Sequence, residues 1–413
     1  MKHLCIIGAG IAGLYLANEL KDKYRVTLIE KRASAGGRIK TKYEDDNVIY
    51  ECGPWRLNEK HRRLLRLIKK YNFTVHRLNS DKTTSLKTFV DLNGLKASQK
   101  NNISGSNLSY RDNNLLRGGL GMSTYKEIKS GYVGIHDAHS KTLPYYADGK
   151  YYVMKEGFTA LVESICAEMK NEIKFLLKTM VVDIIRSNNR YVLKLDTNKT
   201  IRCDKLIIAT PPNTWTGWSI YNHLKPIRHC IDSKSLNHIY ATSNEKLLLK
   251  NKENFAIKTS SPLSQIISSS YQNDWFQISY SGGEIADFWN RLSLNSKNLF
   301  KKTLNDELNK VCTRLKSPKI IVNQVESNYY RHAYHIWLPN FNFNLRRLIK
   351  LSVEPHPIMC PDLYVAGEAF SSNQGWIEGA LETAEKVIQA IDSNMTKVGK
   401  ITAIDFDYLI YDS

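Results

Sequence analysis

Three glycines near the start of the chain have the spacing that lets a backbone approach a phosphate group. Residues 3–32, "HLCIIGAGIAGLYLANELKDKYRVTLIEKR", place Gly8, Gly10 and Gly13 between an apolar strand pattern and a helix pattern. Gly8 would permit the turn, Gly10 would let a pyrophosphate approach, and Gly13 would let the helix pack closely on the sheet. Glu30 follows a second strand pattern, where a carboxylate can accept hydrogen bonds from a ribose. Together these features predict a dinucleotide-binding fingerprint, with the diphosphate at a helix N-terminus, and a chance turn is the weaker interpretation.

The rest of the chain mixes strand and helix patterns with loop-like segments. Residues 178–212 predict a β-meander followed by a buried strand, which paired prolines stop. The polar, Asn- and Ser-rich region 76–150 has weak patterning and predicts loops. Further elements are predicted at 61–70 (helix), 151–169 (strand, turn at Gly157 and helix), 275–281 (strand), 299–312 (helix) and 362–391 (strand, loop and helix). Strands that alternate with helices are typical of an α/β protein.

Composition and charge limit the classes of function. The 413 residues are 42% hydrophobic and 24% charged, as in a globular protein of two or three domains. The formal net charge of +19 is spread along the chain, and its densest run, "HRRLLRLIKK" (61–70), has apolar residues at helical spacing. We therefore expect these basic residues to form a solvated surface, without a nucleic-acid partner.

The cysteines and the apolar runs indicate in which cellular compartment the protein is expected. Seven cysteines form no CxxC pair, so we expect neither a disulfide framework nor a zinc site, and we assign no metal. A reducing, intracellular environment fits this usage best. The N-terminal stretch looks superficially like a signal peptide, but its glycines belong to the fingerprint. No other run reaches 18 apolar residues, so we expect a cytoplasmic protein without a transmembrane helix.

Several segments, in this order, resemble the flavin-dependent amine oxidases, the family of monoamine, polyamine and L-amino-acid oxidases. They are "GAGIAGLYLA" with Glu30, "AGGRIKT", "ECGPWRLNEKHRRLLRLIKKY", "MKEGFTALVESI", "VVDIIRSNNRYVLKL…CDKLIIATPP" and "LYVAGEAFSSNQGWIEGALETAEKV". The resemblance implies an α/β fold with a Rossmann-like FAD-binding domain and a discontinuous α+β substrate domain. It assigns 1–75, 151–212 and 345–395 to the FAD-binding domain, 76–150 and 213–344 to the substrate-binding domain, and 396–413 to a C-terminal tail.

The resemblance also implies which residues hold FAD. Arg38 of "GGR" would reach the phosphates, the backbone of Val182 would hold the adenine, and Glu368 of "AGE" would bind the ribityl or phosphate region. The turn "GWIEGA" would place the N–H of Ile377 and a helix N-terminus near the flavin's pyrimidine end, where they stabilise negative charge. The implied cofactor-binding residues are Gly8, Gly10, Ala12, Gly13, Glu30, Lys31, Arg38, Gly53, Pro54, Trp55, Arg56, Val182, Gly367, Glu368, Gly375, Trp376 and Ile377.

Within the family, "GPWR" and "GWIE" resemble most the L-amino-acid oxidase branch. Gly53 and Pro54 bend the chain sharply, and the bend would border the flavin ring. Arg56 would then bind a substrate carboxylate through two parallel hydrogen bonds. Arg56 could instead cap the following helix or contact FAD, and the sequence leaves these roles open.

The stretch "RHAYHIWLPN" (331–340) resembles one wall of the family's substrate cavity. Tyr334 would face Trp376 and orient an amine by steric confinement, and Trp337 would also contact the substrate. Monoamine oxidases carry a cysteine bonded to FAD just before this aromatic position. Here the residue is Ala333, which implies non-covalent FAD.

Two positions depart from the family pattern. Asn340 falls where amino-acid oxidases carry a carboxylate-binding tyrosine, although an amide can still donate a hydrogen bond. His238 falls where most members hold a lysine that hydrogen-bonds a water next to flavin N5. A histidine could hold this water with a pH dependence of its own, or it could mean altered or lost oxidase chemistry.

The expected activity is oxidation of a C–N bond in a small amine or amino acid. The catalytic candidates are His238, Trp376 and Tyr334, and the substrate-binding candidates are Arg56, Asn340 and Trp337. Hydride would pass from the α-carbon to flavin N5, and oxygen would reoxidise the flavin and give hydrogen peroxide. Two alternatives stay open: a desaturase or dehydrogenase of the superfamily acting on C–C bonds, and a flavin-binding protein without amine turnover. The sequence does not indicate the oligomeric state.

Overall fold

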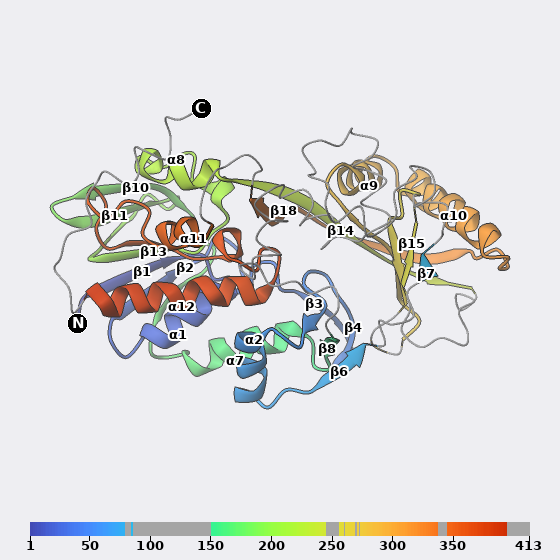
Figure 1. Ribbon diagram of the computed structural model, residues 1–413, viewed down its shortest axis with the longest axis horizontal. Helices are drawn as coiled ribbons and strands as arrows, with labels where there is room; N and C mark the ends of the chain where they lie inside the picture. Colours follow the sequence, from blue (N-terminus) through green and yellow to red (C-terminus); the bar gives the residue numbers. More distant parts are fainter. Residues whose placement is uncertain are drawn as a thin grey trace.

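The computed structural model describes most of the chain (Figure 1). The described residues are 1–78, 84–85, 150–244, 256–259, 261–268, 271, 273–337 and 345–394. Asn340, most of the region 76–150 and the segment 396–413 lie outside them. Along the long axis the described chain forms two parts, one around a parallel sheet and one around a mostly antiparallel sheet.

A five-stranded parallel sheet forms the centre of the first part. Its strand order is β19 (Leu363–Val365), β13 (Lys205–Ile208), β1 (His3–Ile7), β2 (Arg25–Ile29) and β9 (Lys174–Leu176). Strands that are buried on both faces carry continuous apolar runs, as β1 does in "HLCII". Leu4 and Ile6 face one core, and Cys5 and Ile7 face another. The predicted Rossmann-like α/β fold is confirmed.

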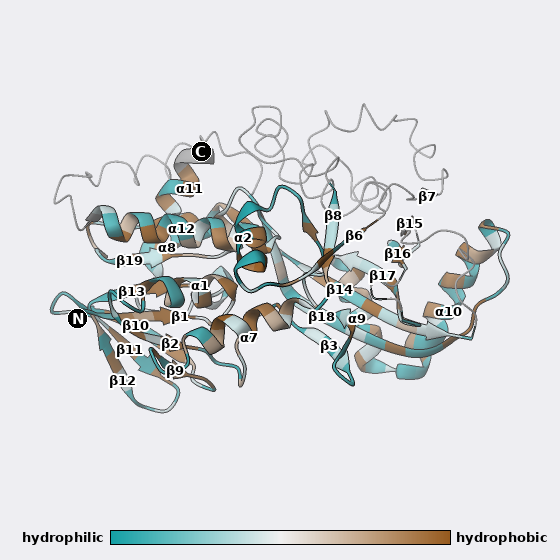
Figure 2. Cartoon of the chain, turned by 90° about the horizontal axis from the view of Figure 1, so that it is seen from below, coloured by the Kyte–Doolittle hydropathy of each residue, from teal (hydrophilic) through white to brown (hydrophobic). Residues whose placement is uncertain are grey.

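Helices cover one face of this sheet, and a second sheet covers the other. The helices are α1 (Ile11–Leu20), α7 (Phe158–Glu168) and α12 (Ile377–Asn394), which share a core. Both α7 and α12 carry apolar and polar residues, as amphipathic helices do (Figure 2). The opposite face packs on the predicted meander, which is formed by β10 (Val181–Ser187), β11 (Arg190–Leu195) and β12 (Thr200–Cys203). Apolar residues of α8 (Tyr221–His229) and α11 (Leu345–Val353) join the same core.

A six-stranded sheet forms the second part. Its order is β18 (Val322–Trp337), β14 (Ile231–Ser243), β17 (Phe276–Gly282), β16 (Gln265–Ile267), β15 (Ala256–Lys258) and β7 (Thr84–Ser85). The long antiparallel strands β14 and β18 extend from the first part into the second (Figure 1). Ile239 and Ala241 of β14 share a core with α9 (Glu284–Asn295) and α10 (Lys297–Arg314). Because side chains alternate along a strand, the even-numbered residues around His238 face away from these helices.

Two small sheets and one helix complete the described fold. The sheets are β3 (Thr41–Glu44) with β4 (Asn47–Glu51), and β5 (Leu57–Asn58) with β8 (Tyr151–Met154) and β6 (Val75–Leu78). The helix is α2 (Arg62–Lys70), which lies where the sequence predicts a helix. Among the described helices, none combines the length and the apolar character that crossing a lipid bilayer requires.

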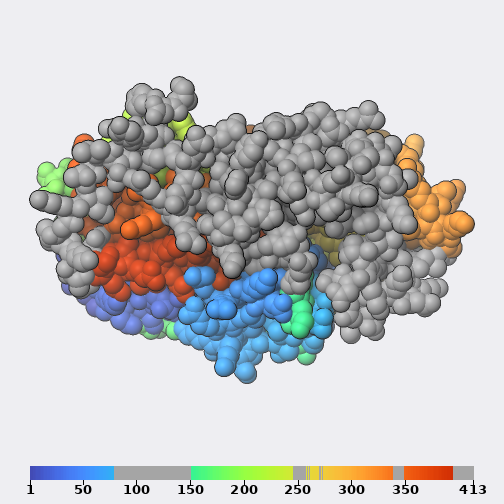
Figure 3. Space-filling view, viewed as in Figure 1, coloured from blue at the N-terminus to red at the C-terminus, as the bar shows by residue number. Residues whose placement is uncertain are grey.

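The basic residues of α2 do not form a purely solvated surface. Acidic side chains of α7 and α12 lie beside them, and the red surface of α12 borders the blue surface of the α2 region (Figure 3). The ion pairs join Arg63 to Glu378 and Glu385, Arg66 to Glu385, and Lys70 to Glu168. The sequence pattern locates the polar face of a helix, but only the packing of α12 and α7 brings these acids within reach.

Candidate active site

The predicted phosphate turn closes the carboxyl end of β1. A Cβ atom at Gly13 would lie 1.9 Å from the carbonyl oxygen of Gly8, so only glycine allows this close packing of α1. A Cβ atom at Gly10 would meet nothing within 4 Å. Gly10 therefore borders open space at the N-terminus of α1, where unpaired N–H groups favour an anion.

Glu30 directly follows β2 and is fixed by the backbone around it. Its carboxylate accepts hydrogen bonds from the N–H groups of Ala9 and Arg32, both at 2.9 Å. The side chain is therefore held beside the phosphate turn with further lone pairs to offer. Lys31 is exposed, and Val182 is 41% exposed at the start of β10.

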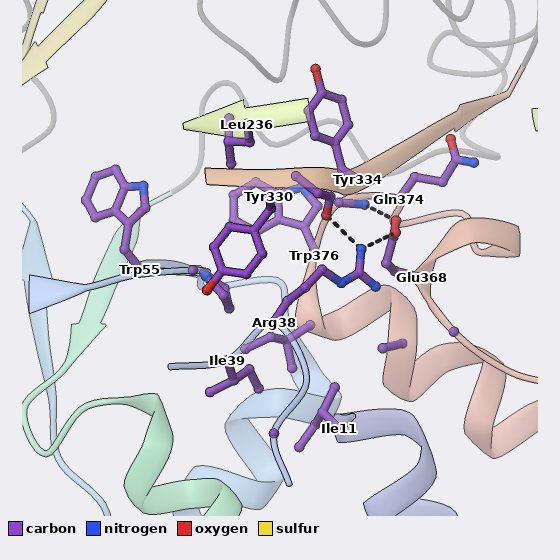
Figure 4. A pocket seen from close by; sticks show the side chains of 18 of the residues that line it. Ile11, Arg38, Ile39, Trp55, Leu236, Tyr330, Tyr334, Glu368, Gln374 and Trp376 are labelled. Atoms are coloured by element: carbon purple, nitrogen blue, oxygen red, sulfur yellow. Dashed lines mark hydrogen bonds and ion pairs between the residues drawn. The ribbon is translucent and has the colours of Figure 1, made fainter. Parts of the chain in front are cut away.

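A large cavity extends from the first turn of α1 to the six-stranded sheet (Figure 4). The cavity is open to solvent, and about 1160 Å³ of space that protein atoms do not fill lies within it and at its mouth. Fourteen of the residues singled out in the sequence line it: Ala12, Arg38, Gly53, Pro54, Trp55, Arg56, His238, Ala333, Tyr334, Gly367, Glu368, Gly375, Trp376 and Ile377. These residues come from distant parts of the chain, so the tertiary structure brings them together.

Glu368 organises one side of the cavity. One of its carboxylate oxygens accepts a hydrogen bond from Arg38 at 2.8 Å and lies 2.6 Å from Nδ1 of His335. The other oxygen accepts from the N–H of Gly375 at 2.7 Å. Arg38 also donates to the carbonyl of Ala333 at 2.7 Å. The carboxylate thus fixes the guanidinium of Arg38 at the cavity wall, next to the turn that precedes α12 (Figure 4).

The turn "GPWR" packs closely against the backbone that precedes it. A Cβ atom at Gly53 would lie 1.9 Å from the carbonyl oxygen of Arg38, which explains the need for glycine in this bend. The guanidinium carbon of Arg56 lies 4.9 Å from the ring centroid of Trp55, 4.5 Å from that of Tyr151 and 5.8 Å from that of Trp376. Cation–π contacts therefore hold Arg56 in place. No carboxylate in the described part of the chain pairs with it.

Two buried groups flank this turn. Glu51 is 1% exposed, and its carboxyl accepts hydrogen bonds from the N–H of Phe158 at 2.7 Å and the hydroxyl of Thr41 at 2.9 Å. Burial raises the pKa of Glu51 to about 8. His61, which precedes α2, packs its ring 4.8 Å from that of Trp376, and burial with the charge of Arg56 lowers its pKa to about 3.

His238 lies on the cavity-facing side of β14. Leu236, two residues earlier, also lines the cavity, whereas Asn237 faces the other way and accepts a hydrogen bond from Ser327. Nδ1 of His238 lies 3.0 Å from the side-chain nitrogen of Gln277. Burial lowers the pKa of His238 to about 3. The water-holding role of this histidine stays a prediction, and any pH dependence that the ring brings lies well below neutrality, because a buried imidazolium is poorly solvated.

Of the aromatic residues expected around the substrate, the structure brings Tyr334 and Trp376 to the cavity (Figure 4). Trp337 is not among the lining residues. It is 2% exposed, its ring lies 6.1 Å from that of Phe370, and its indole N–H donates to the carbonyl of Ser371. It lies three positions after Tyr334, and this odd spacing places it on the opposite face of β18.

The sequence reasoning missed part of the lining. The missed residues are Ile11, Gly36, Ile39, Ala209, Leu236, Tyr280, Tyr330, Gln374 and Ala380. Tyr330 could not have been found by alternation from Tyr334, because the pairing of β18 with β14 shifts register between them. Tyr280 could not either, because only the pairing of β17 with β14 places it opposite His238.

Comparisons with known proteins identify the family of the chain. The model of the family described as flavin containing amine oxidoreductase matches residues 11–100 and 111–391. An L-amino-acid oxidase of Trimeresurus stejnegeri is 38% identical over 82 residues, 19% of this chain and 16% of that protein. The "Putative L-amino-acid oxidase YobN" of Bacillus subtilis (strain 168) is 40% identical over 73 residues, 17% of this chain and 15% of that protein. The chain thus matches less than a fifth of the length of these curated relatives.

A solved structure matches over almost the whole chain. The crystal structure of a "Putative protoporphyrinogen oxidase" from Exiguobacterium sp. 255-15 has a TM-score of 0.67 and covers 95% of this chain and 99% of its own. The two sequences are 16% identical, so this likeness concerns the fold alone.

Proposed function

Because the chain belongs to the flavin-containing amine oxidoreductase family, we propose that it oxidises the C–N bond of an α-amino acid whose carboxylate is bound by Arg56. The position of Arg56 supports this substrate. Its guanidinium lines the cavity among three aromatic rings and pairs with no carboxylate of the described chain. Such a planar fork fits a carboxylate. A simple amine is less well supported, because it would leave the fork without an acceptor.

The cofactor of this family is FAD, and the cavity fits such a group. The open space beside Gly10 at the N-terminus of α1 suits a diphosphate, and Arg38 adds a cation further along. Bound FAD supplies the two-electron acceptor. Ala333 offers no thiol, so denaturation should release the flavin intact.

The residues of the chain would bind and orient the substrate. Arg56 would hold the carboxylate, while the rings of Tyr334 and Trp376 confine the amine. His238 has a pKa of about 3 and therefore does not accept the proton of the amine near neutral pH. The ammonium would lose its proton to solvent, so the activity should rise with pH through the pKa of the bound amine.

Oxygen is the final electron acceptor that we propose. The imine that leaves the site would hydrolyse to a carbonyl compound and ammonia, and hydrogen peroxide would form in the same turnover. The names of the similar L-amino-acid oxidases support this choice, although they describe those proteins. A coupled peroxide assay measures it directly.

The test of Arg56 compares an α-amino acid with its decarboxylated amine in the wild type and in Arg56→Lys. Lysine keeps the charge but loses the planar fork, so the apparent KM for the amino acid should rise about ten- to hundredfold. The amine should be affected little, because it never used the fork. Arg66→Lys, an exposed change on α2, is the matched control and should alter neither substrate.

Two results would contradict the proposal. One is a wild type that prefers the amine, with an amino-acid-to-amine ratio that Arg56→Lys does not change. The other is loss of FAD in Arg56→Lys, which would assign Arg56 to the cofactor.

A second candidate is dehydrogenation of a C–C bond in a larger, ring-containing carboxylate. The observation that favours it is the wall of the cavity, which Trp55, Tyr280, Tyr330 and Tyr334 line together with the neutral His238. A panel of amino acids and of apolar carboxylates, scored by flavin bleaching without oxygen, separates the two reactions. Bleaching by neither group would indicate a flavin-binding protein without turnover.

A further inference from the structure

The buried ring of His238 has one nitrogen that the described chain does not satisfy. The side chain is 1% exposed and lines the cavity, and Nε2 has no hydrogen-bond partner among the described residues. A buried polar group without a partner destabilises the protein, so such groups are uncommon. An atom of whatever occupies the cavity is the natural partner.

Gln277 decides whether this nitrogen donates or accepts. The side-chain nitrogen of Gln277 can only donate, so Nδ1 of His238, 3.0 Å away, accepts. In a neutral imidazole the proton then resides on Nε2. Burial lowers the pKa of His238 to about 3, so the ring stays neutral at physiological pH. In this arrangement of the Gln277 amide, Nε2–H is a hydrogen-bond donor.

The groups around His238 offer no competing acceptor with charge. The ring of Tyr280 on β17 lies 4.9 Å away, and that of Tyr240 on β14 lies 6.4 Å away. Glu368 is the only carboxylate among the lining residues that the structure describes, and Arg38, His335 and Gly375 already engage it.

Aromatic contacts link this donor to Arg56 along one wall. Arg56 packs on Trp55, the ring of Trp55 lies 6.5 Å from that of Tyr280, and Tyr280 packs on His238. The described wall thus presents a cationic fork and a neutral N–H at separate points. A substrate that satisfies both needs two oxygen acceptors.

We propose that the site selects α-amino acids whose side chain carries an oxygen acceptor, a carboxylate or an amide. Nε2–H of His238 would bind the side-chain oxygen while Arg56 binds the α-carboxylate. This inference rests on the proposed function, in which Arg56 binds the α-carboxylate. An aliphatic side chain would leave the buried N–H unpaired, and this penalty is the source of the discrimination.

The test uses ligands that cannot be oxidised at a C–N bond. Butanoate, succinate and succinamate have four carbons each, and their binding to the FAD-loaded protein can be followed by the flavin absorption spectrum. Succinate and succinamate should bind about 5- to 100-fold more tightly than butanoate. Succinamate is the more informative of the two, because its amide adds an acceptor without adding charge.

Two variants locate the effect. His238→Leu should retain butanoate binding but lose the tighter binding of succinamate. Gln277→Leu removes the hydrogen bond to Nδ1, so the imidazole proton is no longer held on Nε2, and succinamate should lose part of its advantage over butanoate. His223→Leu, a partly buried histidine on α8, is the matched control and should keep the full advantage. Thermal unfolding of the ligand-free variants checks that each folds, and His238→Leu should be no less stable than the wild type.

The outcomes separate the two proposals. An advantage of succinamate that persists in His238→Leu would overturn the role of His238 while leaving Arg56 untouched. Weaker FAD binding in His238→Leu, measured by flavin fluorescence, would also overturn it, since the ring would then face the cofactor. Butanoate binding that is absent in the wild type, or unchanged in Arg56→Lys, would instead overturn the proposed function.

Discussion

The two ends of the cavity are built in different ways. At the α1 end, where Ile11 and Ala12 line the cavity, close backbone packing shapes the adjoining turn. Gly8, Gly10 and Gly13 occupy this short turn, and Glu30 beside it is fixed by two backbone N–H groups. At the other end, side chains shape the cavity. Arg56 follows β4, His238 lies on β14, Tyr280 on β17, Tyr334 on β18, and Trp376 directly precedes α12.

The difference shows how much of a site a local sequence motif can predict. A backbone turn depends on residues that are neighbours in sequence, so four positions suffice to identify it. A side-chain wall depends on strand pairing between residues far apart, so no local pattern contains it. Single glycine substitutions should therefore disrupt the first end. The second end should instead be disrupted by substitutions that remove side-chain contacts, charge partners or burial.

The sharpest contrast within the backbone-built end is between Gly10 and Gly13. Gly10→Val should fold but bind no FAD, because its side chain would occupy the open space beside α1. Gly13→Ala should instead lose stability, since its Cβ would lie 1.9 Å from the Gly8 carbonyl oxygen. Flavin content after purification and thermal unfolding measure the two effects. Full FAD occupancy in Gly10→Val would refute the fingerprint.

Glu368 tests whether charge partners hold the cavity wall. Glu368→Gln should destabilise the protein by about 3–5 kcal/mol, because it leaves Arg38 and His335 without their carboxylate. Glu385→Gln is the control, since its pairs with Arg63 and Arg66 are more exposed and should contribute about 1 kcal/mol or less. Denaturant unfolding of both variants gives the comparison, and equal losses would contradict it.

Trp376 and Trp337 separate the cavity wall from the core behind it. Trp376→Leu should keep FAD but slow flavin reduction by substrate about tenfold or more, since positioning contributes strongly to rate. Trp337→Phe should lower the melting temperature and leave the KM unchanged, because Trp337 lies outside the lining. Rapid-mixing absorbance at the flavin band measures the reduction rate. A raised KM in Trp337→Phe would return Trp337 to the substrate site.

Glu51 gives an effect that depends on pH. Its pKa is raised to about 8 in the folded protein, so its contribution is fully present below the unfolded value of about 4.5 and is lost as the pH rises toward 8. Glu51→Gln removes this titration and should reduce the loss of stability between pH 5 and pH 8 by about 3–4 kcal/mol. Glu163→Gln, on the exposed side of α7, should leave the pH profile unchanged. A parallel profile in Glu51→Gln would mean that Glu51 is ionised in the fold.

The sequence by itself determined the α1 end and the order of elements around it. The glycine spacing, the apolar run of β1 and the position of Glu30 are local, and the fold they predict is confirmed. It also determined that a sharp turn carries Arg56, because Gly53 and Pro54 act through their own backbone geometry. It could not determine what the guanidinium contacts, since Tyr151 and Trp376 are remote in sequence.

Only the tertiary structure decided the properties of the other end. Strand pairing placed Tyr280 opposite His238 and turned Trp337 into the core. Burial, which is a property of the whole fold, made His238 a neutral group where its residue type alone suggested a titrating one. A residue's charge and hydrogen-bonding role depend on its solvation and its partners, and both are set by long-range packing.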